Sequence, residues 1–225
     1  MRIIVSQLPP IRGPDVWGDR TPHRAALLHP LAARSFVDLY EASGQAIEVT
    51  DCFRTPQGSL DAMRSKRGVQ PPGYSAHNYG LAVDLTIDEI LRSPKWDYER
   101  ILNFMAAYGW HCHRRDHRRG SEDWHFNWLG PKADAYLSLY PTRGWDAPAE
   151  QRMQDIYGAE MKIPPSEIEE RLSALGFRGT HVERVRAFQA KWGLVADGIA
   201  GPRTQRVLAC VTAERVLKPI PDATK

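Results

Sequence analysis

Two short stretches in the middle of the chain have large apolar residues at every second position. The first runs from 81 to 87, where the apolar side is formed by Leu81, Val83, Leu85 and Ile87. The second runs from Trp124 to Leu129, where Trp124, Phe126 and Trp128 alternate with His125 and Asn127. A period of two is typical of a strand with one buried face. We therefore predict two strands, with Asp84 and His125 each on the face turned away from the core.

Other stretches predict further elements. Residues 47–54 alternate, which predicts a strand with Ile47 and Val49 on one face and Cys52 and Arg54 on the other. Helical spacing of apolar residues predicts helices over 22–43, with a break at Pro30, and over 95–108. Shorter helices are expected from Pro56 to Arg67 and over 131–140, and residues 9–22 are expected to be irregular.

The last third of the chain has a different organisation. Three prolines fall within 141–164, so we place a linker at 144–163 between a domain of residues 1–143 and a smaller unit of residues 164–218. In that unit, Ser166-Glu167-Ile168-Glu169 predicts a capping box and a first helix ending at Gly176. A second helix is expected over 181–192, with the apolar stripe Val182, Val185, Phe188 and Trp192. A third should begin after Gly201-Pro202, giving a three-helix bundle followed by a tail of residues 219–225.

The composition limits the classes of protein to which the chain can belong. At 225 residues, 42% apolar and 25% charged, the chain is typical of globular proteins, and its net charge of +3 is too small to indicate nucleic-acid binding. The apolar run at the N-terminus is too short for a secretory signal, and no run approaches the ~18 apolar residues that a membrane span needs, so we expect neither. Three widely separated cysteines imply no disulfide framework, so we expect synthesis in a reducing cytoplasm. No apolar stripe is left unassigned, and we expect a monomer.

His77, Asp84 and His125 together suggest a site for one zinc ion. Zinc binds imidazole nitrogen and carboxylate oxygen, and three protein ligands leave a fourth position for water. The charge of the ion lowers the pKa of that water toward ~7, and a nearby carboxylate can accept the proton. Arg54 is the candidate donor to the oxyanion that forms when an amide carbonyl is attacked. A single histidine is more commonly a surface or packed residue, but the joint spacing favours ligands, with Gly80 allowing close backbone approach.

The identity of the base is open on pattern alone. In an extended strand, Asp123 shares a face with His125, whereas Glu122 reaches that face only if a turn or bulge precedes the strand. Residues 111–119, rich in His and Arg, allow three readings: a second metal site, a basic rim that guides an anionic substrate, or a solvated loop. Cys112 and Cys210 are interpreted as structural or incidental.

The pattern Ser75-x-His77-x-x-Gly80-x-Ala82-x-Asp84, followed by Glu122-x-Trp124-His125, resembles the signature of the zinc D-Ala-D-Ala carboxypeptidase family. This family includes vancomycin-resistance dipeptidases and carboxypeptidases and several phage endolysins. The resemblance covers roughly residues 22–140 and implies an α+β fold with a small antiparallel sheet and flanking helices. It implies His77, Asp84 and His125 as zinc ligands, Glu122 rather than Asp123 as general base, and Arg54 as stabiliser of the polarised carbonyl. Cys52-Phe53 stands where relatives more usually have Gly-Tyr, which affects the pocket near Arg54.

Two further sets of residues follow from the motifs. Ser75 and Trp124, which flank the ligands, are candidate substrate-binding residues. The string from Val185 to Thr204 is similar to the three-helix peptidoglycan-binding module, with a shortened first half. Its motif residues, the candidates for wall binding, are Phe188, Gln189, Trp192, Asp197 and Gly198. The alternative for this unit is a bundle that only stabilises the chain.

Together these patterns predict an endolysin-like zinc peptidase that hydrolyses an amide bond in the peptidoglycan stem peptide. Zinc-bound water is the expected nucleophile and Glu122 the expected base. Without an export signal, such a protein is expected to be made in the cytoplasm and to act on the wall after release. The alternatives are a D-Ala-D-Ala carboxypeptidase or dipeptidase, and a non-catalytic zinc-containing wall-binding protein.

Overall fold

The computed structural model describes residues 1–13, 24–65, 69–112, 117, 122–130, 147–157 and 162–222. The strands are β1 (Arg2–Gln7), β2 (Arg24–Ala25), β3 (Leu27–Leu28), β4 (Val49–Asp51), β5 (Phe53–Arg54), β6 (Ala82–Leu85), β7 (Trp110–His111), β8 (His125–Trp128) and β9 (Glu214–Leu217). The helices are α1 (Pro30–Ala42), α2 (Pro56–Ser65), the 3-10 helix η1 (Ala76–Tyr79), α3 (Ile87–Ile90), α4 (Tyr98–Ala107), α7 (Ala147–Tyr157), α8 (Pro165–Ala174), α9 (His181–Lys191) and α10 (Pro202–Val211). This is the expected α+β class of fold.

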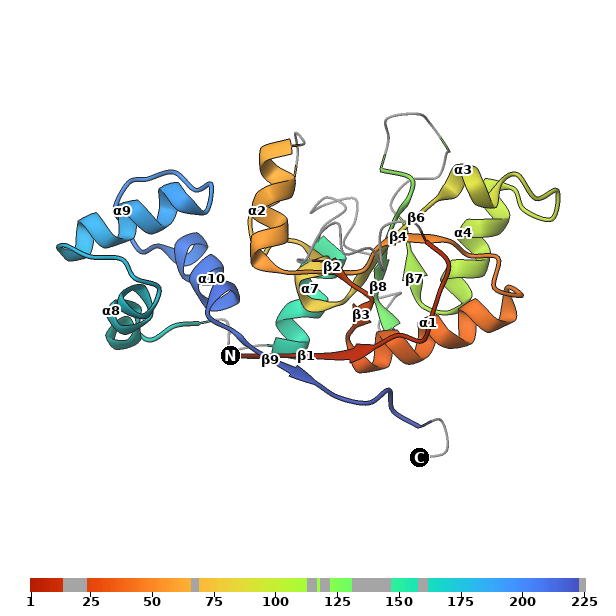
Figure 1. The fold of residues 1–225 in the computed structure, drawn as a ribbon, viewed down its shortest axis with the longest axis horizontal. Helices are drawn as coiled ribbons and strands as arrows, with labels where there is room; N and C mark the ends of the chain where they lie inside the picture. Colours follow the sequence, from red (N-terminus) through yellow and green to blue (C-terminus); the bar gives the residue numbers. More distant parts are fainter. Residues whose placement is uncertain are drawn as a thin grey trace.

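A four-stranded sheet in the order β4-β6-β8-β7 forms the centre of the fold (Figure 1). All of its pairs are antiparallel. The two alternating stretches of the sequence form its middle strands, β6 and β8, as predicted. The first is shorter than predicted, because Ile87 begins α3 instead of continuing the strand.

The predicted strand 47–54 is divided into two strands that belong to different sheets. β4 pairs with β6, whereas β5 pairs with β2. Val49 lies opposite Leu85, but Asp51 lies opposite Asp84, so one extra residue interrupts the register of β4. The bulge brings Asp51 beside Asp84. Alternation also fails at Cys52, which is buried and not on an open polar face.

The predicted helix over 22–43 is wrong in its first part. Arg24–Ala25 and Leu27–Leu28 form the short strands β2 and β3, and the helix begins at Pro30. From there α1 buries Phe36 and Leu39, and Phe36 meets the ring of Trp110 edge-on at 5.6 Å. Pro30 lies in the first turn of α1, where the backbone N–H that proline lacks would have no partner within the helix.

The segment predicted as a linker, 144–163, contains the helix α7. Ala149, Met153 and Tyr157 recur every four residues along α7 and are buried in the same apolar core as the central sheet. The ring of Tyr157 lies 5.0 Å from that of Tyr79. Much of this segment is therefore packed structure. The helix predicted over 131–140 lies outside the described residues.

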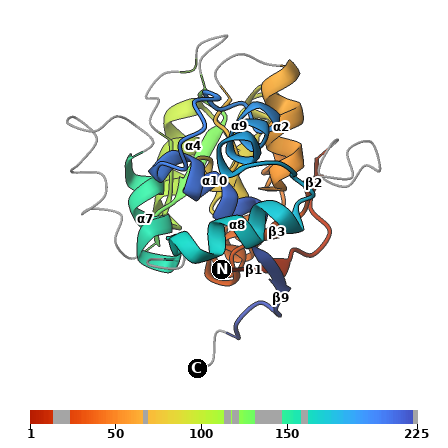
Figure 2. The same ribbon diagram turned by 90° about the vertical axis from the view of Figure 1, so that its left-hand side faces the viewer.

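Helices α8, α9 and α10 occupy one end of the molecule, with α1, α3 and α4 at the other (Figures 1 and 2). They share a buried apolar cluster that also includes Leu60 of α2. Pro202 begins α10, as predicted. The predicted capping box at Ser166 is wrong, because α8 already begins at Pro165; the capping box belongs to α9, between Thr180 and Glu183. Val182 is 44% exposed and lies outside the buried stripe.

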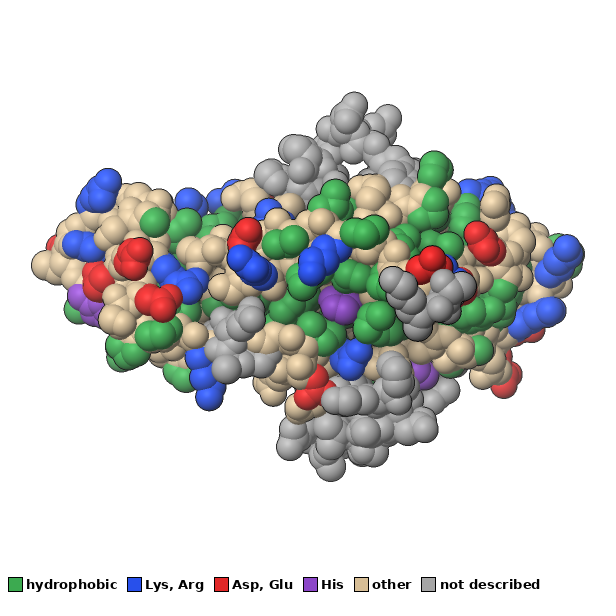
Figure 3. All heavy atoms as spheres, turned by 90° about the horizontal axis from the view of Figure 1, so that it is seen from below, with side chains coloured by type: hydrophobic (Ala, Val, Ile, Leu, Met, Phe, Trp, Pro, Cys, Tyr) green, Lys and Arg blue, Asp and Glu red, His purple; other side chains and the backbone are tan. Residues whose placement is uncertain are grey.

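A three-stranded sheet that the sequence pattern did not predict joins the N-terminal and C-terminal segments of the chain. β1 pairs with β3 in antiparallel fashion and with β9 in parallel (Figure 1). Ile3 and Val5 of β1 are buried in the main core. None of the helices in the described parts of the chain is long and apolar enough to cross a membrane. On the face seen in Figure 3, basic and acidic side chains are interspersed.

Candidate metal centre

His77 is held by a short, tightly anchored helix. Ser75 caps η1, its Oγ accepting a hydrogen bond from the backbone N–H of His77 at 3.4 Å. Gly80 ends the helix with φ +67°, and its carbonyl accepts the His29 N–H at 2.8 Å. A Cβ at Gly80 would lie 2.5 Å from the His29 nitrogen, so the close backbone approach expected at this glycine is present. Ser75, predicted to bind substrate, has this capping contact in the structure.

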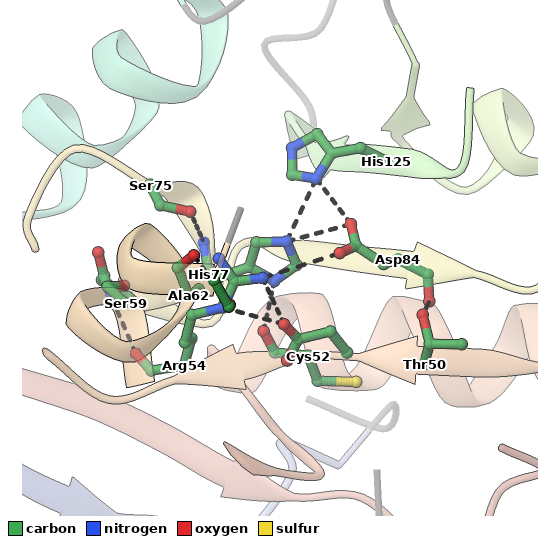
Figure 4. Close-up of polar contacts among 12 residues, drawn as sticks. Thr50, Cys52, Arg54, Ser59, Ala62, Ser75, His77, Asp84 and His125 are labelled. Atoms are coloured by element: carbon green, nitrogen blue, oxygen red, sulfur yellow. Dashed lines mark hydrogen bonds and ion pairs between the residues drawn. The ribbon is translucent and has the colours of Figure 1, made fainter. Parts of the chain in front are cut away.

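Asp84 and His125 are directly opposite each other on neighbouring strands. They are register partners in the antiparallel pair β6–β8, which places both side chains on the same face of the sheet. His77 reaches the same point from η1 (Figure 4). The structure therefore brings together the three residues that the sequence predicts as ligands.

Three ligand atoms form a small triangle. His77 Nε2 is 3.2 Å from Asp84 Oδ1 and 3.2 Å from His125 Nδ1. His125 Nδ1 is 2.8 Å from Asp84 Oδ1. Bond lengths of about 2.0–2.1 Å at a tetrahedral angle would put neighbouring ligand atoms about 3.3 Å apart. The triangle is thus close to one face of a tetrahedral coordination sphere.

The other ring nitrogen of each histidine has an acceptor of its own. His77 Nδ1 donates to the carbonyl of Cys52 at 2.5 Å, and His125 Nε2 donates to Asn127 Oδ1 at 3.2 Å. These bonds leave lone pairs on His77 Nε2 and His125 Nδ1, which face each other and the Asp84 oxygen. Three lone-pair donors so close together repel one another unless a cation or proton lies between them. The group could therefore hold a metal ion.

The charges at this group make protons compete with a metal. Burial favours a raised pKa for the Asp84 carboxyl, but His77 and the hydrogen bond from His125 hold that pKa well below its usual range. Burial lowers the pKa of His125, yet Asp84 outweighs this and raises it. A metal must displace the proton that His125 retains, so we expect metal affinity to fall as pH falls through the raised pKa of His125.

Arg54 lies beside the triangle and is held by a residue that the sequence analysis missed. Its Nε is 3.0 Å from Asp51 Oδ2, and its Nη2 makes an ion pair with the same oxygen. Nη2 is also 3.8 Å from the second carboxylate oxygen of Asp84. Burial lowers the pKa of Arg54, but Asp51 and Asp84 together raise it, so the guanidinium stays charged. The signal that could have identified Asp51 is a carboxylate three residues before the arginine.

The turn that Glu122 requires is present. The N–H of His125 donates to the carbonyl of Glu122 at 3.3 Å, which folds residues 122–125 into a turn ahead of β8. Glu122 is exposed, and its charge contributes to the raised pKa of His125. Asp123 is buried and its carboxylate contacts His117. Trp124, in the same turn, is 37% exposed. The roles of Glu122, Arg54 and Trp124 remain predictions.

Most of the basic stretch 111–119 lies outside the described residues; His111, Cys112 and His117 are described. His117 bridges the carboxylates of Asp123 and Asp88, with Nε2 3.1 Å from Asp88 Oδ1. Within the described ranges, His77, Asp84 and His125 form the one group of three side chains close enough to share a metal. A second metal in this stretch gains no support from its described part.

Most of the residues predicted to bind the cell wall contribute to the packing of the C-terminal helices. Phe188, Gln189 and Trp192 are buried, with at most 5% of their surface exposed, whereas Asp197 is exposed. The Gln189 amide donates to Asp197 Oδ1 at 2.7 Å and accepts from the Gly198 N–H at 2.9 Å. The buried motif residues therefore have a structural role in this unit. That the unit binds the cell wall stays a prediction.

A comparison of the sequence with family models and with curated proteins finds no match. The function is therefore inferred from the site and the sequence motifs.

Proposed function

We propose that this chain is a zinc-dependent peptidase that hydrolyses an amide bond in the stem peptide of peptidoglycan. The observation that carries the proposal is the convergence of His77 Nε2, His125 Nδ1 and Asp84 Oδ1, with a largely buried, charged Arg54 beside them. Two imidazoles and one carboxylate are a ligand set that zinc uses in hydrolytic enzymes. When bound, zinc would activate a water molecule and polarise the scissile carbonyl.

The residues around the triangle would stabilise the polarised carbonyl and transfer the proton. The Arg54 guanidinium, held in place by Asp51, would donate hydrogen bonds to the carbonyl oxygen as negative charge develops there. The exposed Glu122 carboxylate, in the turn that leads to His125, would accept the proton from water and return it to the leaving amine. Its position supports Glu122 over Asp123, since the Asp123 carboxylate already contacts His117.

The choice of substrate rests on the resemblance of the two motifs to peptidoglycan enzymes and to a peptidoglycan-binding module. If helices α8–α10 do bind the wall, surface residues other than the buried motif residues make the contacts. A D-Ala-D-Ala carboxypeptidase or dipeptidase differs in which bond is cut. A non-catalytic zinc protein is the alternative from another class, but it has no use for an acid such as Glu122 at the edge of the ligand group.

The variant Glu122→Gln tests the proposal. We expect it to keep one zinc ion per chain but to clear purified peptidoglycan about 100-fold more slowly or worse, because the proton acceptor is lost. Asp123→Asn is the matched control, since it makes the same change in the neighbouring residue that contacts His117. His77→Ala should lose both zinc and activity.

Mass spectrometry of the released fragments identifies the bond, because each cut leaves a different new amine. Release of terminal D-Ala alone would indicate the carboxypeptidase alternative. Zinc-loaded wild-type protein that releases no new amine from peptidoglycan would overturn the proposal in favour of a non-catalytic protein. Full activity in E122Q would exclude Glu122 as the base.

A further inference from the structure

Arg152 of α7 is a buried positive charge without a negative partner among the described residues. Only 8% of its surface is exposed, and its Nε has no hydrogen-bond acceptor. The guanidinium carbon lies 5.0 Å from the centre of the Trp128 ring, which is its one described interaction. Burying a charge is costly unless it is paired or hydrogen-bonded, and a stacking contact offsets only part of that cost. The site therefore favours an anion.

Two neighbouring polar atoms also have no hydrogen-bond partner in the part of the chain that the structure describes. One is the indole Nε1–H of Trp128, a residue that is only 5% exposed. The His29 ring stacks on Trp128 with centroids 6.3 Å apart, and its Nδ1 is buried without a partner. Burial and, after it, the charge of Arg152 lower the pKa of His29 to about 4, so this imidazole is neutral near pH 7 and can donate one hydrogen bond.

The start of α1 adds to the positive potential. His29 is the N-cap residue of this 13-residue helix, its side chain caps no backbone N–H, and the first turn contains no acidic residue. The free N–H groups and the dipole of a helix N-terminus favour negative charge. The Arg152 guanidinium thus lies over the Trp128 ring, and His29, the N-cap residue of α1, stacks on the same ring, whose own N–H is a further donor.

We propose that Arg152, Trp128 and the N-terminal end of α1 at His29 form a binding site for an oxyanion, either a carboxylate or a phosphate group. This site is separate from the metal centre. His125 and Asn127 of β8 point to the metal face, whereas Trp128 lies opposite Trp110, which packs against Phe36 of α1. His29 is only partly buried and offers the approach from solvent.

Titration of the wild-type protein with sodium phosphate or sodium acetate, against sodium chloride at equal ionic strength, tests the site. The Trp128 indole N–H resonance, identified by its loss in Trp128→Phe, should shift and saturate, and the melting temperature should rise with the same midpoint. A response to phosphate alone indicates a phosphate ligand, and a response to acetate alone or to both indicates a carboxylate-compatible site.

Arg152→Gln should weaken this binding about ten-fold or more, because a charge-assisted hydrogen bond is lost. Arg100→Gln is the control: Arg100 also stacks on a tryptophan, with its guanidinium 5.5 Å from the Trp96 ring, but on the exposed surface. If R152Q fails to fold, W128F tests the site through the melting temperature, which should rise less with added anion than in wild type, since this variant keeps a ring beneath Arg152 and removes only the indole donor. An unmoved Trp128 resonance with both anions, or equal affinities in R152Q and R100Q, would overturn the proposal.

Discussion

Two carboxylates share the Arg54 guanidinium at different distances. Asp51 contacts it directly, whereas Asp84 lies 3.8 Å away and offers its other oxygen to the histidines. Asp51 therefore neutralises Arg54 without using the ligand oxygen of Asp84. Removing Asp51 would leave the arginine charged, largely buried and free to draw Asp84 away from the triangle.

Asp51→Asn should accordingly lower the free energy of unfolding by about 3 kcal/mol or more, because the largely buried Arg54 guanidinium loses the carboxylate that contacts it directly. Urea unfolding measures this. The matched control is Asp61→Asn, since Asp61 pairs with Arg64 at the same spacing, but at 3.4 Å and with side chains 48% and 66% exposed. That change should cost less than about 1 kcal/mol. Equal losses in the two variants would contradict the role assigned to Asp51.

Single residues also show which parts of the site could be predicted from the sequence and which could not. Asp84 and His125 were predictable because both strands keep a strict period of two, so parity places them on one face. The position of Asp51 beside Asp84 was not predictable, because the extra residue in β4 depends on how β4 pairs with β6, a long-range contact that no local pattern records. The motif residues around Gln189 were found as a set, but spacing cannot distinguish a set that binds a partner from one that packs inward.

At the scale of elements, the position of His77 depends on η1 and on the glycine that ends it. Gly80 has a positive φ and lies against the backbone of Leu28 and His29, which joins η1 to the start of α1. Backbone atoms cannot give way as a flexible side chain can. A side chain at this position would therefore displace η1, and His77 with it.

The variant Gly80→Ala should be less stable than wild type by more than the cost of the positive φ alone, which is about 1 kcal/mol. It should also bind zinc more weakly in competition with a chelator. Gly44→Ala is the control, because Gly44 has the same φ of +67° but open space around it. If G80A and G44A lose equal stability and neither loses zinc affinity, the contact with His29 does not position the ligand.

Elements missed in the sequence share a physical cause. β2 and β3 are two residues long and exist only through their partners β5 and β1, so they carry no pattern of their own. Ile3, Ile4 and Val5 form a continuous apolar run, which periodicity alone does not assign to a strand. The prolines that suggested a linker include Pro148, which falls in the first turn of α7, where proline is tolerated.

At the scale of the whole molecule, the C-terminal helices lie against the segment that leads to the metal ligands. Arg206 of α10 donates to the carbonyl of Gly73 at 2.7 Å, and its guanidinium carbon lies 4.2 Å from the Tyr74 ring, one residue before Ser75. Cys210 of α10 is buried in the main core, where burial raises the pKa of its thiol to about 12. The C-terminal helices are thus a packed part of the structure.

Deleting residues 214–225 should lower the melting temperature by about 5 °C or more, because β1 loses its parallel partner and the hydrogen bond from the Glu214 N–H to the Met1 carbonyl. Deleting only 219–225 is the control, because it retains Lys218, whose backbone N–H donates to the Val5 carbonyl at 2.8 Å. Hydrogen exchange at Ile3 and Val5 should become faster in the first variant and stay unchanged in the second. Similar melting temperatures for both truncations would show that β9 contributes little.

β1 cannot pair with β9 until Glu214, the register partner of Arg2, has been synthesised. A ribosome that adds about 5–20 residues per second needs roughly 10–40 s to travel from the first of these residues to the second. Throughout that interval β1 has a free edge, and its run of three β-branched residues, Ile3, Ile4 and Val5, can pair with another chain. The nascent protein is therefore expected to be prone to aggregation through its first strand until β9 has been synthesised, most of all when synthesis stalls before that point.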